Sequence, residues 1–263
     1  MLVDTHAHLN FRDYEKDLER VIAKAGKAGV AKIICVSSNI ADSEKAVAIA
    51  REYPGTVFAA VGIHPQKTDP ENADTPENQI GLLEKLAGNK SVVAIGECGL
   101  DFSPAPPGET DRPRQEQESL FRGQIEIARK YSLPLIIHTR KAFAETMKIL
   151  GQNITGLPNG GVVHCYSAGK KGIAAVLNVG LYFGLDGNLT YDPGLQSVAK
   201  LIPAEKLLLE TDSPFLTPEP YRGSRNEPAN VKITADKLAE IKNQSFTEIS
   251  KITTNNAAAL FGL

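Results

Sequence analysis

The 263-residue sequence has few cysteines and no long hydrophobic run. Its three cysteines, Cys35, Cys98 and Cys165, are too few and too widely spaced for a disulfide framework or a zinc knuckle, which is typical of a reducing compartment. No apolar run approaches the ~18 residues of a membrane-spanning helix, and Met1–Asp4 does not begin a basic and then apolar secretory signal. We therefore expect a cytoplasmic globular protein that does not cross a membrane.

Two further absences narrow the function. The formal net charge is only −2, so the chain lacks the broadly basic surface of stable DNA-binding proteins, and any contact with nucleic acid must be local. The sequence also contains neither a Gly-x-Gly-x-x-Gly motif nor a P-loop, and the first predicted strand-to-helix turn, His8–Phe11, has no glycine-rich phosphate cradle. These features disfavour chemistry that depends on a nucleotide cofactor.

Short apolar segments alternate with longer segments of helical periodicity along the whole chain, a pattern typical of parallel βα units. The predicted strands are Leu2–Leu9, Lys32–Ser38, Val57–Pro65, Val92–Leu100, Pro134–Arg140, Gly161–Ser167, Leu181–Gly187 and Leu207–Leu216. The predicted helices are Asp13–Gly29, Ala41–Tyr53, Glu77–Ala87, Arg114–Tyr131, Ala142–Leu150, Lys170–Asn178, Leu195–Leu201 and Ala229–Lys242.

Eight βα units in about 250 residues predict an α/β fold, a single-domain (β/α)8 TIM barrel over residues 1–263. A doubly wound open sheet is the alternative, which the missing phosphate cradle disfavours. An extra C-terminal helix with a frayed start is expected in Ser245–Leu263, with Thr254–Leu260 packed on the body. The proline-rich segment Ser103–Pro113 is expected to be a loop, either a lid or substrate contact or a solvated excursion.

The histidines are the strongest indication of chemistry. The sequence contains five: His6, His8, His64, His138 and His164. All of them fall at predicted C-terminal strand ends, where the active sites of barrel enzymes lie. In the first strand, two-residue alternation puts Asp4, His6 and His8 on one face, which must point into the barrel. A divalent cation would satisfy these polar groups together.

Two carboxylates join the histidines. Glu97 and Asp212 each follow an apolar strand segment, and an ionised carboxylate is costly to bury unless it is paired or coordinated. Imidazole and carboxylate ligands together suit zinc, manganese, nickel or iron, and magnesium where oxygen ligands dominate.

Seven motifs in order resemble the motif series of the TatD family. They are Thr5-His6-Ala7-His8-Leu9, Gly62-Ile63-His64-Pro65, Gly96-Glu97-Cys98-Gly99-Leu100-Asp101, Ile137-His138-Thr139-Arg140, His164-Cys165-Tyr166-Ser167, Glu210-Thr211-Asp212-Ser213-Pro214 and Arg222-Gly223-Ser224-Arg225-Asn226-Glu227-Pro228. That family comprises metal-dependent deoxyribonucleases of the amidohydrolase-like barrel superfamily. The resemblance implies an exonuclease whose partner is DNA, either single strands or 3′ ends, and a monomer is the default expectation.

The resemblance also implies a two-metal site. His6, His8, Glu97 and Asp212 would hold one divalent ion, and Glu97, His138 and His164 would hold the other, so that Glu97 bridges them; the ions are expected to be Zn, Mg, Mn or Ni. Two ions about 3.5–4 Å apart would activate a water and hold the scissile phosphate. Glu97 and Asp212 are therefore the expected catalytic residues, with Asp212 as ligand and general base.

Five residues are candidates for substrate binding. His64 has the spacing of a phosphate contact, and Arg140, two residues beyond His138, could hold a phosphate bidentately or form an ordinary salt bridge. Arg222, Arg225 and Asn226 lie in a loop that could supply the local positive patch. The alternative is a structural clamp in which Arg222 or Arg225 ties this loop to Glu227 or to the barrel rim.

Neighbouring residues suggest supporting roles. Glu210 shares the inward face with Asp212 and could orient the ligands or be a buried structural acid. Alternation directs Cys98 and Cys165 toward the helix layer, so neither is expected to be a ligand. Tyr166 could stack on a base or pack as a rim aromatic.

Other functions remain open on the same barrel. The activated water could instead hydrolyse amides, lactones or phosphotriesters, or release D-amino acids from misacylated transfer RNA. The loop at Ser103–Pro113 and the segment Tyr166–Gly169 depart from the family pattern, which leaves the substrate preference open. A binding protein with a vestigial site is a further alternative, although none of the six ligands is missing.

Overall fold

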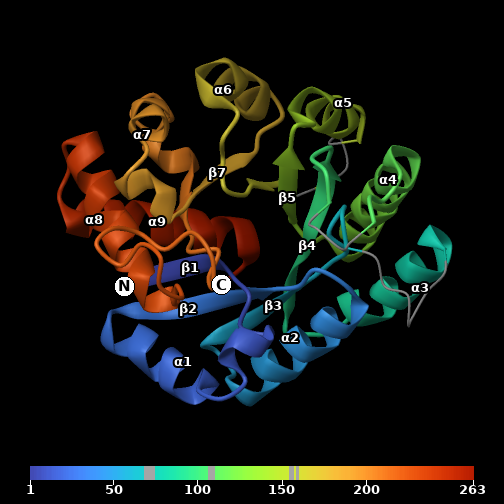
Figure 1. The fold of residues 1–263 in the computed structure, drawn as a ribbon, viewed down its shortest axis with the longest axis horizontal. Coiled ribbons are helices and arrows are strands. Elements are labelled where there is room, and N and C mark those ends of the chain that lie inside the picture. The colour runs from blue at the N-terminus through green and yellow to red at the C-terminus, as the bar shows by residue number, and fades with distance from the viewer. Residues whose placement is uncertain (68–74, 106–109, 154–156, 158–159) are drawn as a thin grey trace.

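Eight parallel strands form one sheet that curls into a nearly closed barrel (Figure 1). The computed structural model describes residues 1–67, 75–105, 110–153, 157 and 160–263. The strands follow one another around the sheet in chain order: β1 (Leu2–Ala7), β2 (Val30–Val36), β3 (Val57–Val61), β4 (Val92–Asp101), β5 (Leu135–Arg140), β6 (Gly161–Val163), β7 (Tyr182–Leu185) and β8 (Leu207–Leu209). The predicted (β/α)8 barrel is confirmed.

The barrel closes between β1 and the segment that follows β8. Ala7 and Ser213 form a parallel bridge. The His8 amide donates to the Ser213 carbonyl at 2.8 Å, and the Asp212 amide donates to the His6 carbonyl at 2.9 Å. These bonds fix Asp212 beside the end of β1, so two distant parts of the chain meet at the same point of the rim.

Helices surround the strands on the outside of the barrel (Figure 1). They are α1 (Leu18–Lys27), α2 (Ile40–Glu52), α3 (Pro76–Ala87), α4 (Arg114–Tyr131), α5 (Phe143–Asn153), α6 (Gly169–Asn178), α7 (Pro193–Ala199), α8 (Val231–Lys242) and α9 (Phe246–Phe261). Among the described residues, no helix is both long and apolar enough to cross a membrane.

Helix α9 is the predicted extra helix. Its start is not frayed as expected, because Ser245 and Glu248 form a capping box that satisfies free backbone amides of the first turn. Its last turns pack against β1 and β8 as predicted. Ala257, Leu260 and Phe261 are buried there in one apolar cluster with strand residues.

That cluster fills one end of the barrel interior. Seven strands each contribute to it, through Val3, Ile34, Val36, Ala60, Ala94, Ile136, Val162 and Leu208. Branched and small apolar side chains are the usual filling of a barrel interior. Because α9 joins the same cluster, it covers this end of the barrel, and the polar residues gather at the opposite end.

Strand β1 contains an irregularity that alternation did not predict. Asp4 pairs with Ile33 and Ala7 with Cys35, so three steps along β1 match two along β2. One extra residue reverses the alternation of a strand. The prediction that Asp4 shares a face with His6 and His8 is therefore wrong: the Asp4 carboxylate accepts hydrogen bonds from the backbone and hydroxyl of Thr211 at 3.0 and 2.6 Å.

Several predicted strands end earlier than expected at the same rim. β3 ends at Val61, β6 at Val163 and β8 at Leu209. Beyond β6 and β8 the backbone leaves the extended region, with φ of 44° at Cys165 and 53° at Asp212. Such positive φ angles are incompatible with a strand. The chemically important side chains of these segments thus lie on the first residues after the ladder.

Candidate metal centre

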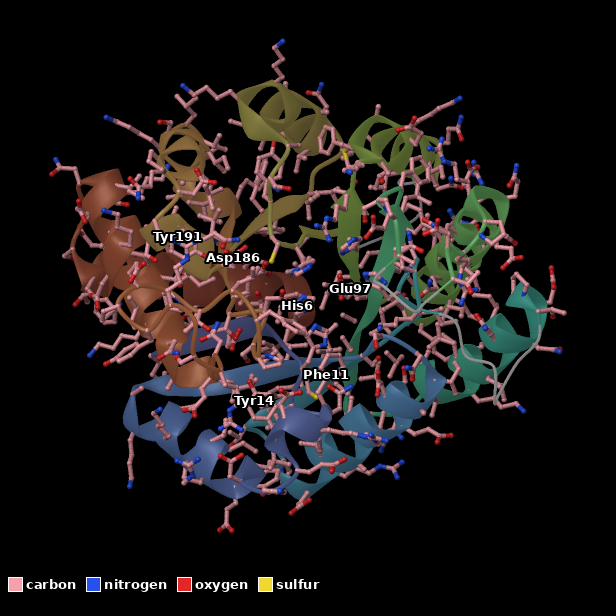
Figure 2. The ribbon with its side chains drawn as sticks, in the orientation of Figure 1. His6, Phe11, Tyr14, Glu97, Asp186 and Tyr191 are labelled. Carbon is pink, nitrogen blue, oxygen red and sulfur yellow. The ribbon has the colours of Figure 1, made fainter. Side chains whose placement is uncertain are left out.

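The six predicted ligands converge at the C-terminal end of the barrel. β1 supplies His6 and, one residue beyond its end, His8, while β4 supplies Glu97 and β5 supplies His138; His164 and Asp212 follow β6 and β8. Figure 2 shows His6 and Glu97 close together near the middle of the ring of strands. The Glu97 carboxylate stands between two groups of imidazoles, and each group faces one of its oxygens.

The first group lies on the side of Glu97 Oε2. This oxygen is 3.7 Å from His6 Nε2 and 4.0 Å from His8 Nε2. Asp212 Oδ1 lies 3.5 Å from the His6 nitrogen and 3.3 Å from the His8 nitrogen. The two imidazole nitrogens are themselves 3.2 Å apart. Four potential donor atoms from three segments of the chain thus surround one point.

The second group lies on the side of Glu97 Oε1. This oxygen is 2.7 Å from His138 Nδ1 and 3.3 Å from His164 Nε2. His64 Nε2 is 3.8 Å from Oε1. His64 therefore lies closer to this group than we expected for a residue that only contacts the substrate. His64, Glu97 and His138 could by their spacing hold one ion. The Gln66 amide, however, donates to His64 Nδ1 at 3.1 Å, so in the neutral ring Nε2 carries the proton and is a donor.

Polar partners on the far side orient three of the rings. His8 Nδ1 lies 2.9 Å from the Val36 carbonyl, and its proton is held there. His138 Nε2 lies 3.2 Å from Asp101 Oδ2, and His164 Nδ1 lies 3.2 Å from Glu210 Oε1. Such partners fix the tautomer of a ligating histidine and make it more basic. In each ring the other nitrogen faces the centre, where it could bind a cation once its own proton is released.

Asp101 is the functional residue that the sequence analysis missed. It belongs to β4, where alternation from Glu97 places residues 97, 99 and 101 on one face, and its Cα partner in β5 is Arg140. The same alternation, applied forward from Glu97, could have identified it. Glu210, for which two roles were left open, is fully buried and contacts His164, which supports an orienting role.

The donor set fits bound divalent metal. Ligand nitrogens and oxygens lie about 2.0–2.2 Å from a zinc-like ion, so neighbouring ligands of one ion are about 3.0–3.5 Å apart. His6, His8 and Asp212 meet this spacing at 3.2–3.5 Å. With the proton of His8 held by Val36, its inner lone pair faces other acceptors. A cation would remove the repulsion between these buried acceptors.

The electrostatics of the cluster are dominated by Glu97. Burial raises the pKa of its carboxyl, but the charge of His164 and hydrogen bonds to His138 and His164 bring the pKa well below its usual value. For His164, burial lowers the pKa, while Glu97 and Glu210 outweigh burial and hold it well above the ordinary value. Without metal the cluster therefore carries protons that a bound cation would displace.

Sequence comparison agrees with this geometry. A family model described as "TatD related DNase" matches residues 3–262. The chain belongs to the TatD family. The resemblance seen in the seven motifs is thereby confirmed, and the protein is a metal-dependent hydrolase.

Similar TatD-family proteins come from bacteria and animals. The chain is 38% identical over 264 residues to YabD of Bacillus subtilis (strain 168), an uncharacterized metal-dependent hydrolase, with 99% of each chain covered. It is 33% identical over 269 residues to the 3′-5′ ssDNA/RNA exonuclease TatD of Edwardsiella piscicida, with 100% of each covered. The crystal structure of YJJV, a TatD homologue from Escherichia coli K12, has a TM-score of 0.88 at 28% identity and covers 100% of this chain and 98% of that one.

In this TatD-family chain a cavity of about 590 Å³ opens over the metal centre. Its lining includes five of the six predicted ligands, together with His64. The basic residues in its lining are Arg12, Lys45 and Lys67, next to the acidic Asp13 and Asp42. Positive charge at the cavity therefore comes from the segments that follow β1, β2 and β3, and not from the loop after β8 as predicted.

The loop after β8 has a structural role at two of its three predicted substrate contacts. Asn226 is completely buried, and its amide donates to the Thr211 and Phe215 carbonyls at 3.0 and 2.7 Å. Arg225 pairs with Asp17 at 2.8 Å and with Glu227 at 3.1 Å. The structure thus corrects Asn226 from a substrate contact to a backbone support, and Arg225 forms the clamp that was the alternative.

The other two arginines that were predicted to contact the substrate lie at the surface. The Arg222 guanidinium lies 4.1 Å from the centre of the Tyr191 ring. Arg140 is exposed at the end of β5 and does not line the cavity over the metal centre. Neither position supports a contact with the phosphate of a substrate bound in this cavity.

Other expectations for this rim had mixed outcomes. Cys98 is buried toward the helices as expected, whereas Cys165 lies next to His164 and Glu210, within reach of one common ion, because the chain turns after β6. Tyr166 is 1% exposed and packs against Phe183, so it is the rim aromatic and not a stacking surface. Part of the predicted lid, residues 106–109, lies outside the described residues.

Proposed function

We propose that this protein is a two-metal phosphodiesterase that removes nucleotides from single-stranded DNA ends. One ion would be held by His6, His8, Glu97 and Asp212, and the other by Glu97, His138 and His164. The observation that carries this proposal is that the two oxygens of Glu97 face different imidazole groups, at 3.7 Å for His6 and 2.7 Å for His138. A single carboxylate so placed suits a bridge between two ions.

Bound divalent ions would supply Lewis acidity and lower the pKa of a water molecule in the cavity. The protein's own groups then have distinct tasks. Asp212 lines the cavity, and its carboxylate can accept the proton of the attacking water. Glu97 holds the two halves of the site together and keeps its negative charge, because its pKa is well below the usual value.

His64 is suited to the substrate phosphate. Burial lowers its pKa to about 3, so the ring is neutral near pH 7. Its Nδ1 accepts from the Gln66 amide, which leaves the Nε2 proton free to donate into the cavity. A neutral donor beside Glu97 can bind a phosphate oxygen without repelling the metal ions. This arrangement supports the substrate-contact role over a ligand role.

DNA is the substrate that the site supports best. Arg12, Lys45 and Lys67 in the cavity lining can each contact a phosphate, although Asp13 and Asp42 lie beside them, and bound divalent ions would supply the main attraction for a polyanion. Relatives bear the names deoxyribonuclease and 3′-5′ ssDNA/RNA exonuclease. The amide, lactone, phosphotriester and transfer-RNA deacylase alternatives use the same activated water. A vestigial site is disfavoured because all six ligands converge.

The test is hydrolysis of 5′-end-labelled single-stranded DNA by purified protein with Mg²⁺, Mn²⁺ or Zn²⁺, with chelator as the control. We expect metal-dependent 3′→5′ shortening, and the same assay on RNA compares the two nucleic acids. A panel of lactones, amides and a phosphotriester is assayed in parallel. Intact DNA under all metals together with turnover of the panel would overturn the phosphodiesterase proposal.

A further inference from the structure

Two phenylalanines stand beside the metal centre at the mouth of the cavity. Phe11 and Phe215 both line it. The Phe11 ring is stacked on His8, with centroids 4.5 Å apart and planes inclined by 12°. Phe215 meets Phe11 edge to face, with centroids 6.2 Å apart and an interplanar angle of 72°. Figure 2 shows Phe11 on the side of the centre toward α1.

Phe215 exposes an apolar ring without an evident packing reason. Of the described residues, four large hydrophobics are exposed, namely Met1, Leu201, Phe215 and Tyr221, and of these Phe215 alone lines the cavity over the metal centre. It is 51% exposed. A ring held in water at the mouth of a polar cavity offers an apolar face to a ligand.

The backbone holds both rings in place. The Phe215 amide donates to the Asp212 carbonyl at 2.9 Å, and the buried Asn226 amide donates to the Phe215 carbonyl at 2.7 Å. The Phe11 amide donates to the His8 carbonyl at 3.1 Å. The backbone of each phenylalanine is thus tied to a segment that carries a predicted metal ligand, which keeps both rings beside the centre.

We propose that Phe11 and Phe215 form a stacking platform for the unpaired base of the nucleotide next to the bond that is cut. This inference rests on the proposed nuclease function. The surroundings favour a nucleotide over a purely apolar ligand, because Arg12, Asp13, Asp42 and Lys45 make the rest of the lining polar and the proposed metal ions would hold a phosphate beside the rings. Aromatic faces bind single-stranded nucleic acid by stacking and accept every base, since each base has a π face.

The platform explains how one site can select single strands without selecting sequence. A base inside a duplex is already stacked on both faces and is not available to the rings. An unpaired end can place its base on the rings and its phosphate over the centre at the same time. The rings thereby position the phosphate, and their removal is expected to weaken productive binding.

The experiment compares Phe215→Leu and Phe11→Leu with the wild type on two kinds of single-stranded DNA. One carries normal bases, and the other has an abasic site at the terminal or the penultimate 3′ nucleotide. Phe11→Tyr, which keeps the stacking ring, is expected to restore the rate. Tyr221→Leu is the matched control, because Tyr221 is 56% exposed but does not line the cavity.

For normal DNA we expect kcat/KM to fall by about fivefold to a hundredfold in each leucine variant. On DNA that is abasic at one of the two positions, the variants should equal the wild type within about twofold, because the base that the rings bind is already missing. A merely structural role of the rings would instead lower the rates on both DNAs equally.

Each result decides the question. A loss of kcat/KM that is confined to DNA with normal bases supports the platform. Equal loss on normal and abasic DNA at both positions, or no loss on either, overturns the platform while the nuclease proposal stands. Absence of any metal-dependent DNA hydrolysis by the wild type overturns both proposals.

Discussion

Replacement of Glu97 by glutamine tests the bridging role most directly. The substitution keeps the shape of the side chain but removes its charge and turns one oxygen into an amide nitrogen. In the structure Oε1 is 2.7 Å from His138 Nδ1, whose ring is bonded on its other side to Asp101. The new amide can donate to that nitrogen. The neutral side chain, however, no longer offsets the charge of buried His138 and His164, whose pKa values Glu97 raises, so we expect Glu97→Gln to fold but, in chelator near pH 7, to melt below the wild-type temperature.

Metal binding should weaken as well. Two divalent ions about 4 Å apart repel each other by on the order of 15 kcal/mol at an effective dielectric constant of about 20. The Glu97 carboxylate is the negative group that lies between the two imidazole groups. Without it, joint occupancy becomes unfavourable, and the variant should bind at most one ion. A loss of at least about a thousandfold in kcat, or about 4 kcal/mol of barrier, follows if both ions are needed.

The measurements are metal content after dialysis, melting temperature in chelator and the rate of DNA shortening. Glu44→Gln is the matched control, since Glu44 is an exposed carboxylate on α2 away from the cavity. A variant that retains two ions per chain and works within about tenfold of the wild-type rate would refute the bridge. A variant that melts in chelator at or above the wild-type temperature would refute the argument from the charge of Glu97.

Three further predictions concern neighbouring positions. Asp101→Asn should weaken metal binding by about 10–100-fold in a metal titration, because it removes the carboxylate that orients His138; unchanged affinity would contradict that role. Arg225→Gln should lower the melting temperature without changing metal content. Since Arg225 holds the pKa of Asp17 at about 2, against an ordinary value of 3.8, this stabilisation is present above pH 3.8 and lost as the pH falls through about 2, so denaturant melts of the two proteins should converge there. Gly99→Ala should cost more than about 3 kcal/mol of stability by the same melts, because a Cβ would lie 2.0 Å from the His138 carbonyl at a φ of +137°; a stable variant with wild-type metal content would contradict this.

The barrel and the convergence of the six candidate ligands at one rim could be predicted because both depend on local pattern. Apolar segments of strand length recur eight times, and a parallel barrel brings all their C-terminal ends to one rim. Histidines that lie at those ends must therefore meet, whatever the loops between them do. His6 and His164 are far apart in the sequence, yet their rings stack with centroids 3.9 Å apart.

The failures arose where one residue or one distant partner decides the outcome. At Asp4 a single extra residue in β1 reverses the face, and nothing in the local sequence marks the bulge. At Arg225 and Asn226, polar side chains in a predicted phosphate-binding loop instead satisfy groups within the protein. The partner of Arg225 is Asp17, 208 positions away. Only the folded structure shows which groups such a residue contacts.

The distribution of charge around the cavity is consistent with a metal-dependent site. Glu97 and Asp212 both line the cavity, and by themselves they would repel a phosphate. Arg12, Lys45 and Lys67 are opposed there by Asp13 and Asp42, so the side chains alone leave little attraction for DNA. Bound cations reverse this balance at the position where the phosphate must sit. In the proposed function, a chain with a net charge of −2 would act on a polyanion through an attraction that depends on the metal and is confined to the centre.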